Sequence, residues 1–153
     1  MTRDLMREPA PVLVADDNEE DWFLIQKAFV KNRIANPYYW VKDGNELLDF
    51  LHRRGNYADP DHAPRPGLVL LDLNMPGKDG RTALQEIREH PDLRHLPVVA
   101  LTASGERREV VEAYELGVNS FLVKPDTFEQ LSELVKCLSR YWFEVVQLPP
   151  EET

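Results

Sequence analysis

Five short apolar runs, spaced at nearly even intervals, constrain the fold more than any other feature of this sequence. They occupy residues 12–15, 39–41, 68–71, 98–101 and 121–123, so their starts are 27, 29, 30 and 23 residues apart. Continuous runs rich in Val and Leu are typical of strands buried on both faces of a parallel sheet. This spacing is that of a repeated strand–helix–strand unit.

The intervals between the runs carry helical patterns. The first expected helix follows Asn18, a possible N-cap. The next three cover residues 45–51, 82–89 and 106–116, and the fifth starts near Asp126 or Thr127. Gly117 is expected to end the fourth of them. In the last helix Phe128, Leu131, Val135, Leu138 and Trp142 recur at spacings of three and four, which indicates one apolar stripe. Alternating strands and helices predict an α/β fold, and right-handed crossovers make a doubly wound five-stranded parallel sheet the default.

Composition sets the class of protein. The 153 residues fit one domain, with 42% hydrophobic and 29% charged residues, and no apolar run approaches the roughly 20 residues of a membrane span. We expect residues 10–142 to form the domain, between a tail over 1–9 and a dimer or docking tail over 143–153. The net charge of −9 disfavours nucleic-acid binding. The single cysteine, Cys137, fits a reducing, cytoplasmic location, and we expect it to be buried and inert.

Chemically active side chains gather where the predicted strands end. Asp16 and Asp17 follow the first run, Asp72 the third, Thr102 the fourth and Lys124 the fifth. In an open α/β sheet, ligands bind beyond the carboxyl ends of the strands. Three acids, a hydroxyl and an ammonium are therefore expected at one edge of the sheet.

A group of three carboxylates needs a cation. Two like charges about 4 Å apart repel by roughly 4 kcal/mol at an effective dielectric constant near 20. Hard oxygen ligands with open positions suit Mg²⁺, and a carboxylate can act as a nucleophile toward phosphorus. Lys124 and Thr102 would then stabilise charge on a transferring phosphoryl group. The simpler alternative is that Asp16 and Asp17 only form a turn and cap a helix.

The motifs at these strand ends together resemble a response-regulator receiver domain over about residues 10–140. They are Ala15-Asp16-Asp17-Asn18, the run from Leu70 to Gly80, Leu101-Thr102-Ala103 and Phe121-Leu122-Val123-Lys124-Pro125. Each motif alone is weak, but four in order, each at the end of a predicted strand, form a specific signal. The resemblance implies a flavodoxin-like fold and a signalling domain, not a conventional enzyme, which assists only its own phosphorylation and dephosphorylation.

The roles of individual residues follow from that resemblance. It implies phosphorylation of Asp72, Mg²⁺ held by Asp16, Asp17, Asp72 and the backbone carbonyl of Asn74, phosphate pairing by Lys124, a switch through Thr102 and Phe121, and a cis peptide bond between Lys124 and Pro125. It also implies a sensor histidine kinase as phosphoryl donor. The loop 55–66, the run after Asp72 and the aromatic tail most resemble the small regulators that serve bacterial phytochromes.

Other functions on this type of fold remain as alternatives. The main one is a pseudo-receiver, a protein-binding module without phosphorylation; it is weakened because Asp72, Lys124 and the acidic pair are all present. A flavodoxin or dinucleotide binder is disfavoured because the loop after the first run is acidic and Gly-x-Gly-x-x-Gly is absent. A phosphatase with an Asp-x-Asp nucleophile is disfavoured because Asn74 stands in the second position.

The aromatic tail predicts an assembly. Tyr141, Trp142 and Phe143 extend the apolar stripe of the last helix beyond the expected end of the domain. Contiguous exposed apolar residues usually mark an interface, so we expect a homodimer. The resemblance to receiver domains implies that the fourth helix, fifth strand and fifth helix form its face, which this tail would extend. The alternative is that the tail folds back over its own domain.

Overall fold

The computed structural model describes residues 9–76 and 78–150, so Gly77 and parts of the two expected tails, residues 1–8 and 151–153, lie outside the described residues. The strands are β1 (Val12–Ala15), β2 (Tyr38–Val41), β3 (Leu68–Leu71), β4 (Val98–Thr102) and β5 (Ser120–Val123). The helices are α2 (Glu19–Lys31), α3 (Gly44–His52), α4 (Gly80–Glu89), α5 (Arg107–Leu116) and α6 (Phe128–Ser139), with a 3₁₀ turn η1 (Gly55–Tyr57) and a π-helical segment η2 (Arg140–Val145). Every strand and helix predicted from the sequence is present.

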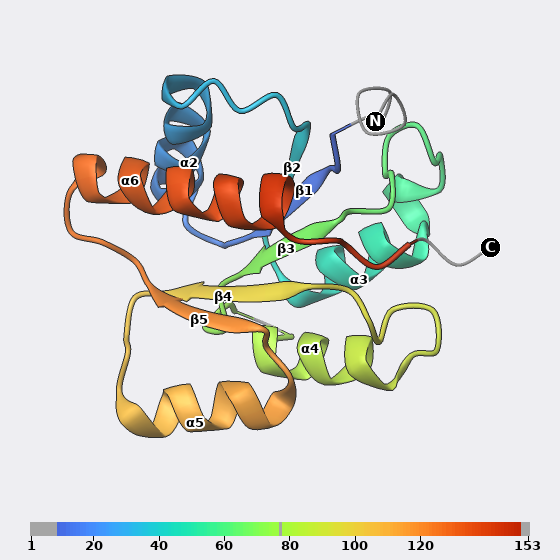
Figure 1. Cartoon of the computed structure of the whole chain (residues 1–153). Coiled ribbons are helices and arrows are strands. Elements are labelled where there is room, and N and C mark those ends of the chain that lie inside the picture. Colours follow the sequence, from blue (N-terminus) through green and yellow to red (C-terminus); the bar gives the residue numbers. More distant parts are fainter. Residues whose placement is uncertain (1–8, 77, 151–153) are drawn as a thin grey trace.

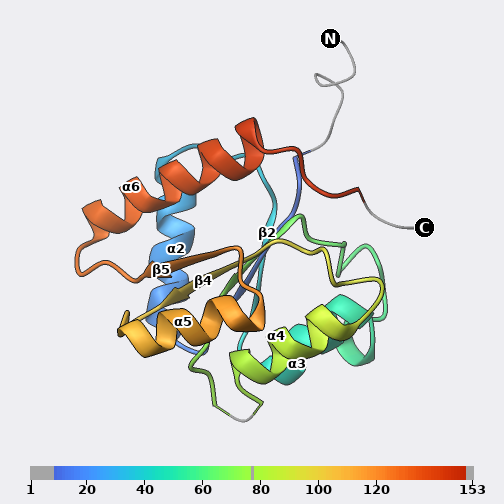
Figure 2. The same ribbon diagram turned by 60° about the horizontal axis from the view of Figure 1, so that its bottom comes forward.

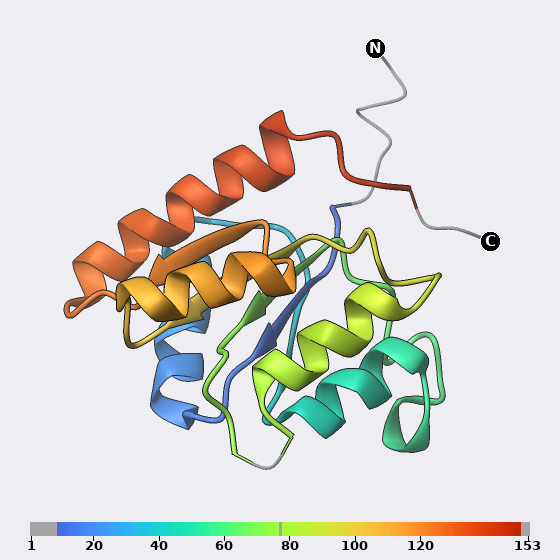
Figure 3. The same ribbon diagram turned by 90° about the horizontal axis from the view of Figure 1, so that it is seen from below.

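The strands form one parallel sheet in the order β2-β1-β3-β4-β5. Helices α2 and α6 lie together on one face, and α3, α4 and α5 cover the other (Figures 1 and 3). The predicted doubly wound, flavodoxin-like fold is therefore confirmed. The strand order reverses between β1 and β3, which makes their carboxyl ends the switch point where ligands bind in such sheets.

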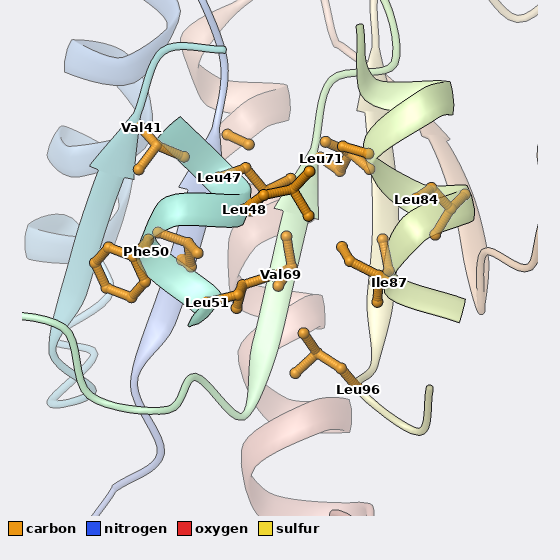
Figure 4. Packing of buried hydrophobic residues seen from close by; sticks show 14 of the residues in the cluster. Val41, Leu47, Leu48, Phe50, Leu51, Val69, Leu71, Leu84, Ile87 and Leu96 are labelled. Atoms are coloured by element: carbon orange, nitrogen blue, oxygen red, sulfur yellow. The ribbon is translucent and has the colours of Figure 1, made fainter. Parts of the chain in front are cut away.

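Alternate residues of each central strand supply two separate cores. Val69 and Leu71 of β3 point to the α3–α4–α5 face, whereas Leu68 and Leu70 point to the α2–α6 face. Figure 4 shows the first core, where Leu47 of α3 and Ile87 of α4 converge on β3. Burial on both faces explains why the strands are continuously apolar and not alternating.

Two aspartates start their helices earlier than the apolar pattern predicted. The Asp43 carboxylate accepts a hydrogen bond from the Glu46 backbone N–H at 2.8 Å, and Asp79 accepts one from Thr82 at 3.0 Å. The caps place glycines at the first positions of α3 and α4, which lie side by side in Figure 2. A Cβ on Gly80 would lie 2.5 Å from the carbonyl oxygen of Asp72, so only glycine lets α4 start so close to β3.

The aromatic tail packs on its own domain. Trp142, in η2, is only 9% exposed and belongs to the α2–α6 core, against which Phe143, Val146 and Leu148 also pack. Tyr141 is 55% exposed. The expectation that a monomer leaves this tail exposed is therefore wrong for Trp142 and Phe143, because η2 continues α6 over the starts of the strands (Figure 1).

Two smaller expectations are also wrong. Cys137 is exposed, because it lies off the apolar stripe that runs through Val135 and Leu138. The bond between Lys124 and Pro125 is trans, as are all peptide bonds of the described residues; trans is the lower-energy form of such bonds. No helix within 9–76 and 78–150 combines the length and apolar character needed to cross a membrane.

Candidate functional site

Parallel pairing brings three carboxylates together at the switch point. Ala15 and Leu71 are partners in the β1–β3 ladder, so Asp16 and Asp72 leave adjacent strands side by side. Asp16, Asp17 and Asp72 each offer an oxygen, and these three atoms lie within 4.8 Å of one another. Asp16 and Asp72 are buried, and Asp17 is exposed. This set of hard oxygens, open to solvent on one side, can hold a divalent cation.

Local hydrogen bonds fix the acidic loop. The Asn18 backbone N–H donates to Asp16 Oδ1 at 2.9 Å, and the Asn18 side chain accepts from the Asp21 N–H at 2.9 Å as the N-cap of α2. The helix cap is therefore Asn18, which leaves the Asp17 carboxylate outside that role. Trp40 Nε1 donates to the Asp16 carbonyl oxygen at 2.7 Å from the neighbouring strand β2, a link that the sequence did not predict.

Lys124 binds three carboxylates at once. Its Nζ lies 2.8 Å from Asp16 Oδ2, 2.8 Å from Asp21 Oδ2 and 2.9 Å from Asp72 Oδ2. Burial lowers the pKa of Lys124, but the hydrogen bonds to Asp16, Asp21 and Asp72 raise it more, so the net shift is upward and the ammonium stays charged. Burial raises the pKa of Asp16, and its hydrogen bonds from Lys124 and Asn18 oppose that shift.

Asp21 is a site residue that sequence reasoning missed. The sequence shows it only as one of three acidic residues directly after the cap Asn18, a place that suits a helix N-terminus. The available signal was its place in the first turn of α2, directly after the acidic loop. Nothing in the sequence showed that its carboxylate meets Lys124, which follows β5.

A series of side-chain hydrogen bonds leads from Asp72 toward α5. Thr102 Oγ1 donates to Asp72 Oδ1 at 3.2 Å, and Asn74 Nδ2 donates to Thr102 Oγ1 at 3.1 Å. Arg81 of α4 donates to Asn74 Oδ1 at 2.9 Å and pairs with Glu112 of α5. Asn74 was expected to act through its backbone carbonyl alone, whereas here its side chain also joins the site to the helices.

Some of the residues singled out from the sequence lie in this site and others lie outside it. Asp16, Asp17, Asp72, Thr102 and Lys124 converge as expected. Phe121 is half-buried against the α3–α4–α5 core, with Ala100 of the neighbouring strand as its ladder partner. Tyr141, Trp142 and Phe143 do not reach the site, because η2 packs near the start of β3, where Leu148 approaches Gly67.

This geometry agrees with the comparison to protein families. The model of the response regulator receiver domain matches residues 12–136, which is most of the chain. The chain belongs to the receiver domain family. Members of this family are signalling domains, and the receiver domain expected from the strand-end motifs is confirmed.

Similar proteins include regulators of phytochromes. Response regulator Rcp1 of Synechocystis sp. is 38% identical over 141 residues, which cover 92% of this chain and 94% of that protein. The crystal structure of the Mn²⁺-bound form of Rcp1 matches with a TM-score of 0.83 at 38% identity, over 93% of this chain and 100% of that chain. The phosphorylated cyanobacterial phytochrome response regulator RcpA matches with a TM-score of 0.86 at 36% identity, over 94% and 100%. The resemblance to small regulators of phytochromes is therefore confirmed for this receiver domain.

Proposed function

We propose that this receiver domain accepts a phosphoryl group on Asp72 from a sensor histidine kinase, with Mg²⁺ held by Asp16, Asp17, Asp72 and the backbone carbonyl of Asn74. One observation carries the proposal. The Asp72 carboxylate lies between the Lys124 ammonium and the Thr102 hydroxyl, within 4.8 Å of oxygens from two further acids. This arrangement provides a nucleophile, a cation site and two donors for the transferred group.

Phosphoryl transfer to Asp72 needs no oxidant, reductant or second substrate. An oxygen of Asp72 attacks the phosphorus of phosphohistidine and the P–N bond breaks. Its electron pair returns to the imidazole, which takes up a proton from water. Bound Mg²⁺ would supply positive charge beside the phosphoryl oxygens. Lys124 pairs with those oxygens and Thr102 donates a hydrogen bond to them. The product is an aspartyl-phosphate on Asp72, and the domain assists only its formation and hydrolysis.

The same contacts support a switch. Thr102 Oγ1 is already 3.2 Å from Asp72 Oδ1, and Phe121 is half-buried against the neighbouring core. A phosphoryl group on Asp72 would favour the inward position of Thr102 and the burial of Phe121, because it adds acceptors that only this state satisfies. Phosphorylation then changes the surface formed by β5 and the helices beside it.

The kinase is proposed to be a phytochrome, on the basis of the similarity to RcpA. The domain should be labelled by acetyl phosphate with Mg²⁺, should stay unlabelled with EDTA, and should take phosphate from a phosphorylated phytochrome kinase at least about tenfold faster than from an unrelated histidine kinase. Intact-mass and radiolabel measurements check both parts. Labelling by neither donor would support the pseudo-receiver alternative, whereas equal rates from both kinases would refute only the phytochrome partner.

We also propose a cytoplasmic homodimer through α5, β5 and α6 that does not bind nucleic acid. Val111 and Tyr114 of α5 and Val123 of β5 are about half exposed on this face, which supports an interface there. The docking role expected for the tail would fall on Tyr141 and Val145, because Trp142 and Phe143 pack inward. The net charge of −9 opposes contact with nucleic acid.

The proposed dimer can be tested by introducing a charged side chain on its apolar face. Light scattering of the full chain at tens of micromolar should give a dimer mass, and Tyr114→Asp should give a monomer, because an interface that buries an unpaired carboxylate is strongly destabilised. Val30→Asp puts the same charge at an exposed apolar position of α2, outside this face; it is the control and should remain a dimer. A monomer mass for the unmodified chain, phosphorylated or not, would contradict the proposal.

A further inference from the structure

Lys124 has no free donor for a phosphoryl group in this structure. A lysine ammonium carries three N–H bonds. Its Nζ lies within 2.9 Å of three carboxylate oxygens, one each from Asp16, Asp21 and Asp72. A phosphoryl oxygen can therefore pair with Lys124 only if one of these contacts is given up.

Asp21 is the partner that separates most easily. Its side chain is 34% exposed, whereas those of Asp16 and Asp72 are 3% and 8% exposed. A buried carboxylate that loses its partner cannot regain water, but Asp21 at the start of α2 can. Asp16 and Asp72 also belong to the cation site, and Asp21 does not.

The charge of Asp21 also opposes the incoming group. Asp21 Oδ2 and Asp72 Oδ2 contact the same Nζ, at 2.8 and 2.9 Å, so the two oxygens are no more than about 6 Å apart. A phosphoryl group on Asp72 adds negative charge at that distance. Partial exposure and salt reduce this repulsion but do not change its sign.

We propose that Asp21 is a competing counter-ion that holds Lys124 in the unphosphorylated state and releases it when a phosphoryl group binds. Asp21 acts through Lys124 and is therefore a positioning residue. The affinity of the domain for a phosphoryl group then depends on Asp21 as well as on the acid cluster Asp16, Asp17 and Asp72. The inference rests on that proposed function.

The test is the affinity for beryllofluoride, a mimic of the phosphoryl group, in saturating Mg²⁺. Asp21→Asn should bind it about five-fold more tightly than wild type, because the competing charge is lost while the side-chain shape is kept. Asp21→Glu keeps the charge and should bind close to wild type. Glu20→Gln makes the same change of charge in the same turn of α2 and should change the affinity less than two-fold, or roughly 0.4 kcal/mol. Fluorine NMR titrations give these constants.

The controls separate this inference from the proposed function. Asp21→Asn leaves the cap of α2 intact, because Asn18 accepts from the backbone N–H of Asp21 and not from its side chain. Binding by Asp21→Asn that is equal to Glu20→Gln, or weaker than wild type, would overturn the inference while the function stands. Failure of the wild-type chain to bind beryllofluoride with Mg²⁺ would instead overturn the proposed function.

Discussion

Replacing Asp72 by Asn is expected to abolish phosphoryl incorporation from acetyl phosphate while leaving the fold intact. The amide that replaces the carboxylate is a poor nucleophile toward phosphorus, and no other acid within 9–76 and 78–150 holds the same place between Lys124 and Thr102. The remaining members of the site keep their contacts, because Lys124 still pairs with Asp16 and Asp21. Intact-mass spectrometry after incubation with acetyl phosphate and Mg²⁺ should show no added phosphoryl group.

The stability of the Asp72→Asn variant is expected to stay close to that of wild type. The amide side chain in the Asp72→Asn variant keeps an oxygen that can accept from the Asn74 backbone N–H, which donates to Asp72 Oδ1 at 2.9 Å. Without Mg²⁺, loss of one like charge from the acid cluster offsets loss of the contact to Lys124, so we expect a change in unfolding free energy within about 1 kcal/mol. Asp92→Asn, at an exposed loop position, is the matched control and should be labelled like wild type. Undiminished labelling of Asp72→Asn would place the acceptor elsewhere.

Replacing Trp142 by Ala is expected to destabilise the domain by about 3–5 kcal/mol, the usual range for removal of a buried aromatic side chain. Trp142 is only 9% exposed and packs in the α2–α6 core. Urea unfolding should show a lower midpoint with little change in slope. A chain truncated after Arg140 should be destabilised as well, because it lacks Trp142 together with Phe143 and Leu148.

Tyr141→Ala is the matched control for the tail. Tyr141 precedes Trp142 directly but is 55% exposed, and its ring contacts the Trp142 ring edge-on at 5.3 Å between centroids. Loss of that contact should cost about 1 kcal/mol. Equal effects of the two substitutions on stability would mean that the tail is not packed on its own domain in solution, and would favour its use as the dimer segment first expected.

Local sequence determined the strands and the chemistry at their ends. Runs such as Leu68–Leu71 are apolar at every position because both faces of a parallel strand are buried, so their places could be read without the fold. The rule that ligands bind at the carboxyl ends of such strands then brought Asp16, Asp72, Thr102 and Lys124 together. The bounds of several elements differ by one or two residues, as at the start of α4, where the capping Asp79 lies before the apolar pattern begins.

Tertiary structure alone decided the contacts that depend on direction and on distance across the chain. Whether Asp21 faces Lys124, 103 positions away, depends on how α2 packs beside α6 on its face of the sheet. Helical periodicity fixes only which residues share a side of a helix. The tail is a second case. Its apolar stripe has to be buried, but the sequence does not determine whether its own domain or a second copy of the chain buries it. The continuation of α6 into η2 keeps Trp142 in the core of its own domain, while Cys137, one position off the stripe, stays exposed.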